Sequence, residues 1–426
     1  MDGKMSPAES AALKELFERK LNGVMRMYLE TCARCGNCVD SCHVYASMPE
    51  AKYTAVGRAE VVRKIFRKYF KSQGNFAPWL GEVLEFDRPT MDKVNEAAYS
   101  CTGCRRCMVH CPFGIDTQQV MAIAKALLIG ADREPKILSM LADMSIAKGE
   151  GIEETRADYA QALRNLEPDV RAIWPGDSAK AAIPYEAEGA DLLYVALSGA
   201  HSIVPAAAIM NAAGEKWTLS SFEAVNFGAF VGDSAKMKKI AKRVIDEAIR
   251  LKVKEVAIVE CGTAFRVIRH MMGEQPFRVL AFVELIDRYI SGRRITLDRS
   301  RLKGKVTYHD PCQIARNSGV LEEPRRVIRA IADDFVELIP NREENWCCGG
   351  GGGLISMGEL EFRMKSSKVK ADQLRGSGAA MVTTACENCH SQLSDLSEHY
   401  ALGIKVEFLS HLVAQALVRP GESYRV

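Results

Sequence analysis

The stretch WCCGGGGG, residues 346–353, joins two adjacent cysteines to a run of glycines. A disulfide between neighbouring cysteines is badly strained, because bridged Cα atoms normally lie about 4.4–6.8 Å apart. The glycines contribute almost no side-chain packing, but glycine accepts a positive φ and lets the backbone approach a ligand closely. The stretch therefore predicts a loop whose two thiolates bind something bulky and soft.

The remaining cysteines also fall into groups. The chain has 426 residues and 14 cysteines, and disulfides do not explain them in a cytosolic chain, where thiols stay reduced. Cys261 stands alone, and the others form three groups: Cys32, Cys35, Cys38 and Cys42; Cys101, Cys104, Cys107 and Cys111; Cys312, Cys347, Cys348, Cys386 and Cys389. This arrangement points to metal binding.

Composition and patterning narrow the class of protein. The formal net charge of +3 argues neither for nor against an anionic partner. No apolar run approaches the roughly 18 residues that a membrane-spanning helix needs, and the charged start lacks the apolar core of a signal peptide. Nothing resembles nucleic-acid recognition. We therefore expect a cytosolic chain, or one peripheral to a membrane, with no nucleic-acid partner.

The first two cysteine groups share the spacing C-x2-C-x2-C-x3-C, in CARCGNCVDSC (32–42) and CTGCRRCMVHCP (101–112). Three cysteines at this spacing wrap one face of a [4Fe–4S] cube, and the fourth usually ligates the other cube. Zinc sites usually pair two C-x-x-C units or add histidines. The spacing predicts two cubane [4Fe–4S] clusters, held by Cys32, Cys35, Cys38 and Cys111 and by Cys101, Cys104, Cys107 and Cys42.

The apolar pattern changes along the chain. Residues 1–150 show helical spacing and predict a small all-α domain, and 151–189 predict a connecting segment with some helix. From 190, short apolar strands alternate with helices, which predicts a parallel α/β arrangement. This half looks duplicated as lobes 190–300 and 301–426, because VECGTAFRVIRH aligns with TACENCHSQLSD and places Cys261 opposite Cys386.

The third cysteine group resembles the CCG domain of iron–sulfur proteins related to the B-type and D-type components of heterodisulfide reductase. The resemblance implies that Cys312, Cys347, Cys348, Cys386 and Cys389 hold a non-cubane [4Fe–4S] cluster that binds and cleaves a disulfide. A conventional cube held by four of the five cysteines, or zinc, stays open. Over nearly the whole chain, the resemblance implies an α + α/β fold: a helical two-cluster ferredoxin domain followed by two tandem α/β CCG lobes.

The first lobe lacks the five cysteines, which makes the chain most similar to cytoplasmic iron–sulfur subunits of membrane redox complexes in sulfate reducers (TmcB, HmcF and DsrK). That similarity implies an oxidoreductase subunit in sulfate respiration, peripheral on the cytoplasmic side of the inner membrane. Its implied partners are a cytochrome b-like integral membrane subunit and further complex subunits, which can include a periplasmic multihaem cytochrome c. The implied substrate is a small DsrC-like protein in its disulfide or trisulfide form.

Two other functions stay open from the sequence. One is an electron-acceptor subunit of a hydroxyacid or glycerol-3-phosphate dehydrogenase, which would favour full cysteine sets in both lobes. The other is a pure electron conduit.

Several single residues are also ambiguous. Cys261 is either a small buried residue or lies close to the loaded lobe. His309, Asp310 and His390 either serve the cluster or are structural. The basic face of 59–71 is either solvated or docks an anionic partner or lipid headgroups.

Overall fold

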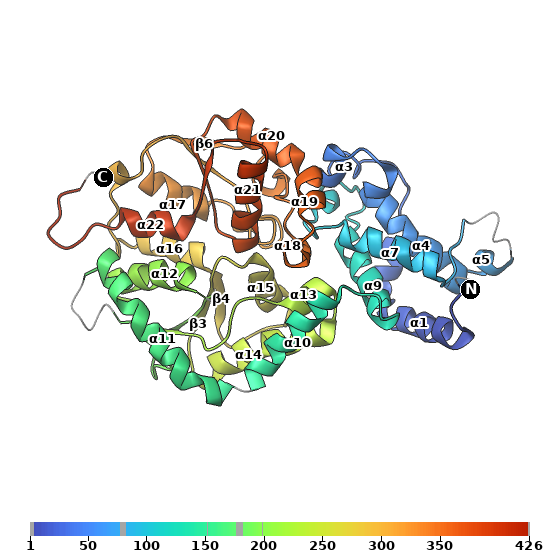
Figure 1. Ribbon diagram of the computed structural model, residues 1–426, viewed down its shortest axis with the longest axis horizontal. Coiled ribbons are helices and arrows are strands. Elements are labelled where there is room, and N and C mark those ends of the chain that lie inside the picture. The colour runs from blue at the N-terminus through green and yellow to red at the C-terminus, as the bar shows by residue number, and fades with distance from the viewer. Residues whose placement is uncertain (1–3, 77–81, 151, 176–181, 198, 425–426) are drawn as a thin grey trace. The chain divides into compact units, whose positions relative to one another are not determined.

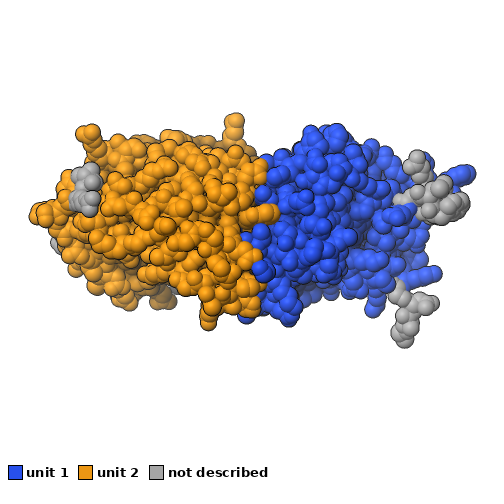
Figure 2. Space-filling view, turned by 90° about the horizontal axis from the view of Figure 1, so that it is seen from above, with its two compact units in different colours: residues 1–142, 227–237, 349–370 blue, residues 143–226, 238–348, 371–426 orange. Residues whose placement is uncertain are grey.

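The computed structural model describes residues 4–76, 82–150, 152–175, 182–197 and 199–424. The chain divides into two compact units, which Figure 2 shows in separate colours. Unit 1 comprises residues 1–142, 227–237 and 349–370, and unit 2 comprises 143–226, 238–348 and 371–426. Two short segments of the α/β half therefore belong to unit 1, so the compact units do not follow the order of the sequence.

Unit 1 is helical (Figure 1). Its helices are α1 (Pro7–Lys20), α2 (Gly23–Glu30), α3 (His43–Ser47), η1 (Ala51–Tyr53), α4 (Ala55–Phe70), α5 (Ser72–Phe76), α7 (Arg88–Tyr99), α8 (Arg106–Val109), α9 (Thr117–Gly130), α13 (Phe227–Val231), α18 (Leu354–Met357) and α19 (Leu360–Ser366). Ser6 caps α1 and forms the predicted capping box with Glu9, which satisfies backbone N–H groups at the helix start. Phe17 of α1 contacts Phe66 and Phe70 of α4 and builds part of the core.

Unit 2 contains two parallel sheets of four strands each. The strands are β1 (Leu192–Val195), β2 (Trp217–Leu219), β3 (Glu255–Ile258), β4 (Arg278–Ala281), β5 (Val306–Tyr308), β6 (Phe335–Glu337), β7 (Met381–Thr384) and β8 (Lys405–Phe408). The strand orders are β2-β1-β3-β4 and β6-β5-β7-β8, so both halves have the same topology. The inner strands β1 and β5 are wholly buried, as expected for parallel sheets covered by helices.

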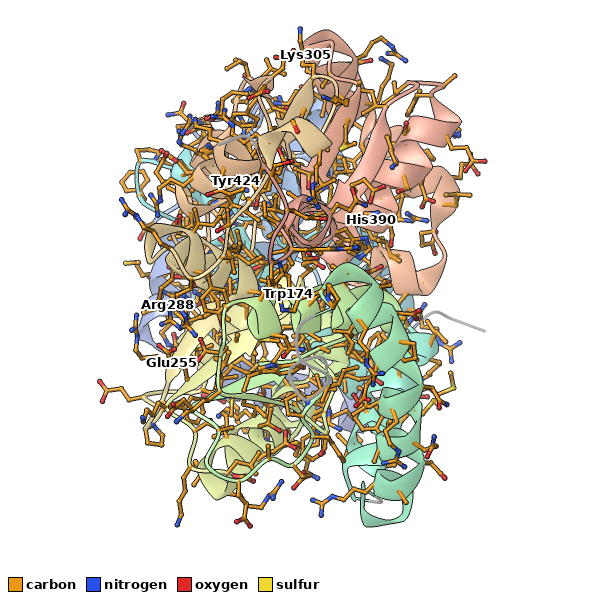
Figure 3. All side chains as sticks on the ribbon, turned by 90° about the vertical axis from the view of Figure 1, so that its left-hand side faces the viewer. Trp174, Glu255, Arg288, Lys305, His390 and Tyr424 are labelled. Carbon is orange, nitrogen blue, oxygen red and sulfur yellow. The ribbon has the colours of Figure 1, made fainter. Side chains whose placement is uncertain are left out.

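Helices surround the sheets and join the two halves of unit 2. They are α11 (Ile152–Ile173), α12 (Ala200–Ala212), α15 (Gly262–Arg266), η3 (Val267–Met271), α16 (Phe282–Ser291), η4 (Arg299–Arg301), α17 (Glu323–Ile331), η5 (Arg342–Glu344), α21 (Glu387–His399) and α22 (Leu409–Ala416). Helix α16 packs on α17, and α12 packs on α22. Arg288 of α16 forms an ion pair with Glu255 of β3 at 2.6 Å, and Figure 3 labels both residues.

Three further helices have residues in both units: α10 (Lys136–Glu150), α14 (Ser234–Arg250) and α20 (Lys368–Ser377). The predicted connecting segment is more ordered than expected, because α11 occupies 22 of its residues and accommodates Pro168. Residues 151 and 176–181 of that segment lie outside the described part. Within the described residues, no helix combines the length and the apolar character needed to cross a membrane.

Candidate metal centres

The first cysteine motif closes around a small cavity in unit 1. Cys32, Cys35 and Cys38 line this cavity together with Cys111 from the second motif. A second cavity in unit 1 is lined by Cys101, Cys104 and Cys107 together with Cys42 from the first motif. The fold therefore exchanges the fourth cysteine of each motif, which gives the two crossed sets named from the spacing.

The backbones of the two motif loops are alike. Arg34 and Gly36 have positive φ values of 54° and 87°, and Gly103 and Arg105 have 68° and 64° at the corresponding motif positions. Left-handed residues turn successive backbone N–H groups toward one concavity, where they attract an anionic group. Sequence reasoning could expect this conformation at the glycines, but not at the two arginines.

The chemistry of the second cavity suits a cationic metal core. Burial raises the pKa of the Cys101 and Cys107 thiols above the ordinary value. Although the nearby Arg58 lowers the pKa of Cys101, burial is the larger effect and disfavours the thiolate form at both positions. Metal binding requires deprotonated cysteine and supplies the further positive charge that stabilises the thiolates. A set of four soft sulfur donors fits iron–sulfur clusters or zinc better than hard cations.

Arg58 of α4 lines the second cavity, and sequence analysis did not single it out. Its guanidinium donates to Cys42 Sγ at 3.3 Å, to Ser100 Oγ at 2.8 Å and to the Ser100 carbonyl at 2.9 Å. The residue is only 2% exposed. Its one signal in the sequence is its place four residues before Val62, on the apolar stripe of the helix. Hydrogen bonds to the sulfur ligands are among the features that set the potential of an iron–sulfur cluster.

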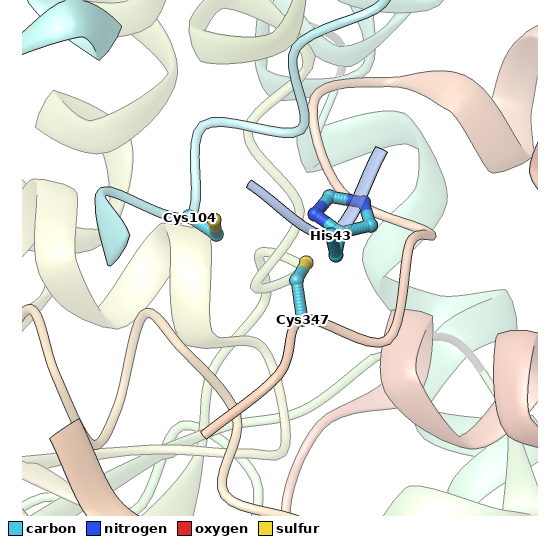
Figure 4. A group of neighbouring side chains, drawn as sticks. All are labelled: His43, Cys104 and Cys347. Atoms are coloured by element: carbon cyan, nitrogen blue, oxygen red, sulfur yellow. The ribbon is translucent and has the colours of Figure 1, made fainter. Parts of the chain in front are cut away.

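His43 directly follows the last cysteine of the first motif and begins α3. Its buried ring lies beside Cys104, with a ring nitrogen within 4.8 Å of the Cys104 sulfur (Figure 4). His43 therefore places a polar ring in the lining of the second cavity. Cys347, also labelled in Figure 4, belongs to unit 2.

All five cysteines of the third group lie in unit 2. Cys312 follows β5, and Cys386 follows the neighbouring parallel strand β7. The carboxyl ends of adjacent parallel strands share one edge of a sheet, where α/β proteins usually bind ligands. Cys312 is partly exposed and the other four are buried.

Two of these cysteines are in direct contact. The sulfur atoms of Cys348 and Cys389 are 3.3 Å apart, and a His309 ring nitrogen lies within 4.8 Å of both. The pKa of Cys386, at the start of α21, is lowered mainly by a hydrogen bond from Cys389. Backbone N–H groups, among them that of Gly262, lower it further. This group of thiols at a sheet edge offers soft sulfur donors of the kind that a metal site needs.

Asp310 holds the loop beside this site. Both of its carboxylate oxygens accept hydrogen bonds from the buried Arg325 guanidinium, at 2.7 and 2.8 Å. Its Oδ2 also accepts from the backbone N–H of Arg342 at 2.7 Å. Asn345 donates to the Asp310 carbonyl at 2.8 Å. Asp310 is therefore a structural anchor, and Arg325 and Asn345 are supporting residues that sequence reasoning missed.

Cys261 lies close to the half of unit 2 that carries the five-cysteine group, which is one of the two positions that the sequence left open. The pKa of its thiol is raised to about 12, mainly by burial and to a smaller extent by the nearby Cys386. The preceding Glu260 is also buried, and its carboxylate accepts from Ser410 Oγ at 2.6 Å. The Glu260 carbonyl accepts from the Glu387 backbone N–H at 2.6 Å. These contacts join the carboxyl ends of β3 and β7.

The glycine run has a packing role in unit 1. A Cβ on Gly351 would lie 2.6 Å from the Thr102 carbonyl oxygen, and one on Gly352 would lie 2.7 Å from that of Cys101. The buried Lys125 of α9 donates to the Gly352 carbonyl at 3.0 Å and to that of Phe230 at 2.6 Å. The glycines thus allow the segment after Cys348 to lie directly on the loop of the second motif.

The predicted basic face of 59–71 is largely neutralised. Arg63 is buried and donates to the Tyr28 carbonyl. Lys64 pairs with Glu82, Lys68 with Glu85 and Lys71 with Glu30, and Arg67 pairs with Glu60. The helix therefore offers little free positive charge to an anionic partner.

Two parts of the chain match known families. Residues 28–115 match a 4Fe-4S dicluster domain, and 306–394 match the cysteine-rich CCG domain. The chain is 29% identical to the D-type component of the dihydromethanophenazine:CoB–CoM heterodisulfide reductase of Methanosarcina acetivorans, over 94% of this chain and 96% of that protein. Over nearly its whole length, the chain is thus similar to the HdrD-like iron–sulfur proteins of heterodisulfide reductases.

Other relatives are also named as oxidoreductases or as subunits of them. An Hdr-like menaquinol oxidoreductase iron–sulfur subunit of Archaeoglobus fulgidus is 26% identical, over 96% of this chain and 82% of that protein. An EtfAB:quinone oxidoreductase of Syntrophomonas wolfei is 22% identical, over 86% of this chain and 55% of that protein. The chain is accordingly an iron–sulfur subunit of a heterodisulfide-reductase-like oxidoreductase.

Proposed function

We propose that the chain is the cytoplasmic iron–sulfur subunit of a membrane-associated redox complex. In this function it relays electrons between a quinone or cytochrome subunit and a five-cysteine site that acts on a disulfide or trisulfide. The relatives support the membrane link, since their names refer to menaquinol, dihydromethanophenazine and quinone. The first lobe lacks the five-cysteine set of the second lobe, which favours the sulfate-reducer group with TmcB, HmcF and DsrK. That group in turn implies a DsrC-like protein as the substrate.

The proposed ligands follow the three groups of thiols. Cys32, Cys35, Cys38 and Cys111 would hold one cubane cluster, and Cys101, Cys104, Cys107 and Cys42 would hold the other. Cys312, Cys347, Cys348, Cys386 and Cys389 would hold a non-cubane [4Fe–4S] cluster. When bound, such clusters supply one-electron transfer and, at the five-cysteine site, the cleavage of a sulfur–sulfur bond.

We assign the sequence modules as a helical ferredoxin-type domain at 1–150, a connecting segment at 151–189, a degenerate CCG lobe at 190–300 and a complete CCG lobe at 301–426. The shared strand order of the two sheets supports the duplication of the last two modules. Segments 227–237 and 349–370, one from each lobe, pack within unit 1. The modules are therefore units of sequence rather than separately packed bodies.

One observation carries the electron-transfer proposal. Gly351 and Gly352 pack on the carbonyls of Thr102 and Cys101, and they follow Cys348 by three and four residues. Three residues of chain span at most about 11 Å. A predicted ligand of the five-cysteine site is therefore linked by a short stretch of backbone to the loop of the second predicted cubane. A short covalent path of this kind favours electron transfer between the two sites.

The chain's own residues have distinct parts in this function. The cysteines position the metal, and Arg58 places a positive charge and an N–H group at Cys42. The Asp310–Arg325 pair fixes the loop that leads to Cys312. Reduction of a disulfide to two thiols consumes two electrons and two protons, and His309 is a polar group within reach of Cys348 and Cys389.

The test uses the protein purified anaerobically from detergent-extracted membranes with its native partner subunits, which we expect to include a cytochrome b-like integral subunit. A reduced quinol analogue is supplied, and thiol formation is measured on the disulfide and trisulfide forms of a DsrC-like protein. We expect thiol release that is lost in Cys348→Ser. Recovery of the chain as a soluble complex with a flavin dehydrogenase would instead support the hydroxyacid or glycerol-3-phosphate alternative.

A further inference from the structure

A pocket in unit 1 lies outside the three groups of cysteines. Its volume is about 760 Å³, and it is lined by residues of α7, of the segment 133–135 and of α18 and α19. Ligand-binding pockets commonly measure about 300–1,000 Å³. All of its lining residues belong to one compact unit, so the pocket is a feature of that unit alone.

The floor of the pocket is aromatic and aliphatic. Tyr53 and Phe362 face each other with ring centroids 6.0 Å apart, and Tyr99 and Leu354 are buried beside them. Aromatic faces attract cations electrostatically. One cation near the rim already uses such a face, since Lys52 Nζ lies 4.8 Å from the Tyr53 ring centroid and 2.7 Å from Glu96.

The charged lining of the pocket is mainly acidic. Four carboxylates, those of Asp92, Glu96, Glu134 and Glu359, line it with one guanidinium, that of Arg133. Arg133 pairs with Asp92, and Glu96 pairs with Lys52. The lining therefore carries an excess of negative charge over an apolar floor, and this combination favours a cation with an apolar stem.

Glu134 provides an independent sign of a missing ligand. Its side chain is only 9% exposed, and its Oε1 pairs with Lys136 Nζ at 3.1 Å. Its Oε2 is buried and has no hydrogen-bond partner among the described residues. A buried carboxylate oxygen without a donor is costly and unusual. Glu134 also lines the pocket, which makes this oxygen the natural partner of a cationic donor bound there.

The pocket is also next to the second cysteine site. Ser100 lines the pocket and directly precedes Cys101. Arg58 donates both to Ser100 and to the sulfur of Cys42. One residue of covalent chain and one shared guanidinium thus connect the pocket wall to two predicted ligands of the second cubane cluster.

We propose that this pocket receives a lysine or arginine side chain of an electron-transfer protein, and that docking there places the partner at the second cubane site. The inference rests on the proposed electron-transfer function and adds to it the site and the charge of the partner. A buried apolar floor inside an exposed, charged rim is the usual anatomy of a protein interface. The acidic lining would also attract a basic partner from a distance, an effect that salt weakens.

The test uses the full-length protein with its metal in place and benzyl viologen as the probe, since this molecule is an organic cation with an aromatic body and, when reduced, a one-electron donor. Binding of the oxidised form is measured by calorimetry, and reduction of the protein by the reduced form is measured by stopped-flow absorbance. Dithionite serves as the anionic donor.

Glu134→Gln removes the charge of the buried carboxylate, and Glu359→Gln alters the exposed rim without disturbing the core. The matched control is Glu361→Gln, which changes an exposed carboxylate of α19 that pairs with Lys365 and lies two residues after Glu359.

We expect Glu134→Gln to weaken viologen binding about tenfold, because the substitution removes a largely buried negative charge that attracts the dication. Glu359→Gln should weaken it about twofold, added salt should weaken it in the wild type, and Glu361→Gln should have no effect. Reduction by dithionite and iron content should not change in any variant. Wild-type binding in both Glu134→Gln and Glu359→Gln would overturn the proposed pocket. Binding that depends on Glu134 without faster reduction would keep the cation site and reject its role in electron entry.

Discussion

At the residue scale, Arg58 is the side chain through which the protein can most directly adjust a metal site. Its guanidinium is buried and donates to the sulfur of Cys42. A positive charge and an N–H···S hydrogen bond both stabilise the more negative, reduced state of a cluster. Ser100 accepts the other two hydrogen bonds and fixes the orientation of the group.

Replacing Arg58 should therefore lower the reduction potential of the second cubane cluster. We expect Arg58→Met to shift it downward by about 60 mV, the one-electron equivalent of a tenfold change in equilibrium, and Arg58→Lys to shift it less because the charge is kept. Potentiometric titration followed by electron paramagnetic resonance measures the shift. The first cluster is the internal control, and equal shifts of both clusters would show a general structural effect instead.

Sequence reasoning located the thiols better than it located the charged groups that support them. Cysteine spacing is informative because few other functions need it, and the two cavities group the thiols as the spacing predicted. Their role as metal ligands stays a prediction. Arg58, Arg325 and Lys125 are buried through contacts with segments distant in sequence. An isolated arginine or lysine normally indicates a solvated surface position, so the sequence gives almost no warning of these roles.

At the element scale, the glycine run serves contact between segments as well as freedom of the backbone. The sequence predicted that these glycines would let the backbone close over a metal site. The structure shows that Gly351 and Gly352 also leave room for the carbonyls of Thr102 and Cys101. Helix α9 contributes Lys125, which binds the carbonyl of Gly352 from a buried position.

Gly352→Ala should therefore destabilise unit 1 by about 1–3 kcal/mol. Gly352 has a φ of 71°, which is unfavourable for alanine, and the added Cβ would press on the Cys101 carbonyl. The matched control is Gly376→Ala in helix α20, where nothing lies within 4 Å of an added Cβ and alanine favours the helix. Anaerobic thermal unfolding measures both variants. Equal stability of the two would mean that the close contact at Cys101 is not needed.

The secondary structure was readable to different degrees along the chain. Apolar strands alternating with helices indicated parallel sheets, and the repeat indicated that two halves share one topology, because both patterns reflect burial within short segments. The sequence did not reveal that 227–237 and 349–370 pack with the N-terminal helices. Such packing depends on glycines and a buried lysine, neither of which produces a periodic pattern.

At the scale of the whole molecule, the chain keeps its two kinds of cysteine set in different compact units. The eight cysteines of the two ferredoxin-type motifs lie in unit 1, and the five of the third group lie in unit 2. Each set is held by contacts within its own unit, such as Arg58 with Cys42 in unit 1 and Cys348 with Cys389 in unit 2. Loss of one set should therefore leave the other sets able to bind metal.

This separation leads to a prediction about iron content. Three four-iron clusters correspond to about twelve irons per chain in an anaerobic preparation. Cys348→Ser should retain about eight irons and both cubane signals, because the ligands of the cubane clusters lie in the other unit. Cys261→Ala should retain about twelve irons, since Cys261 is not among the proposed ligands. Iron analysis and electron paramagnetic resonance on folded protein measure each count. Loss of every cluster from folded Cys348→Ser protein, or a metal-free third group in an intact wild-type preparation, would contradict the proposed division of the ligands.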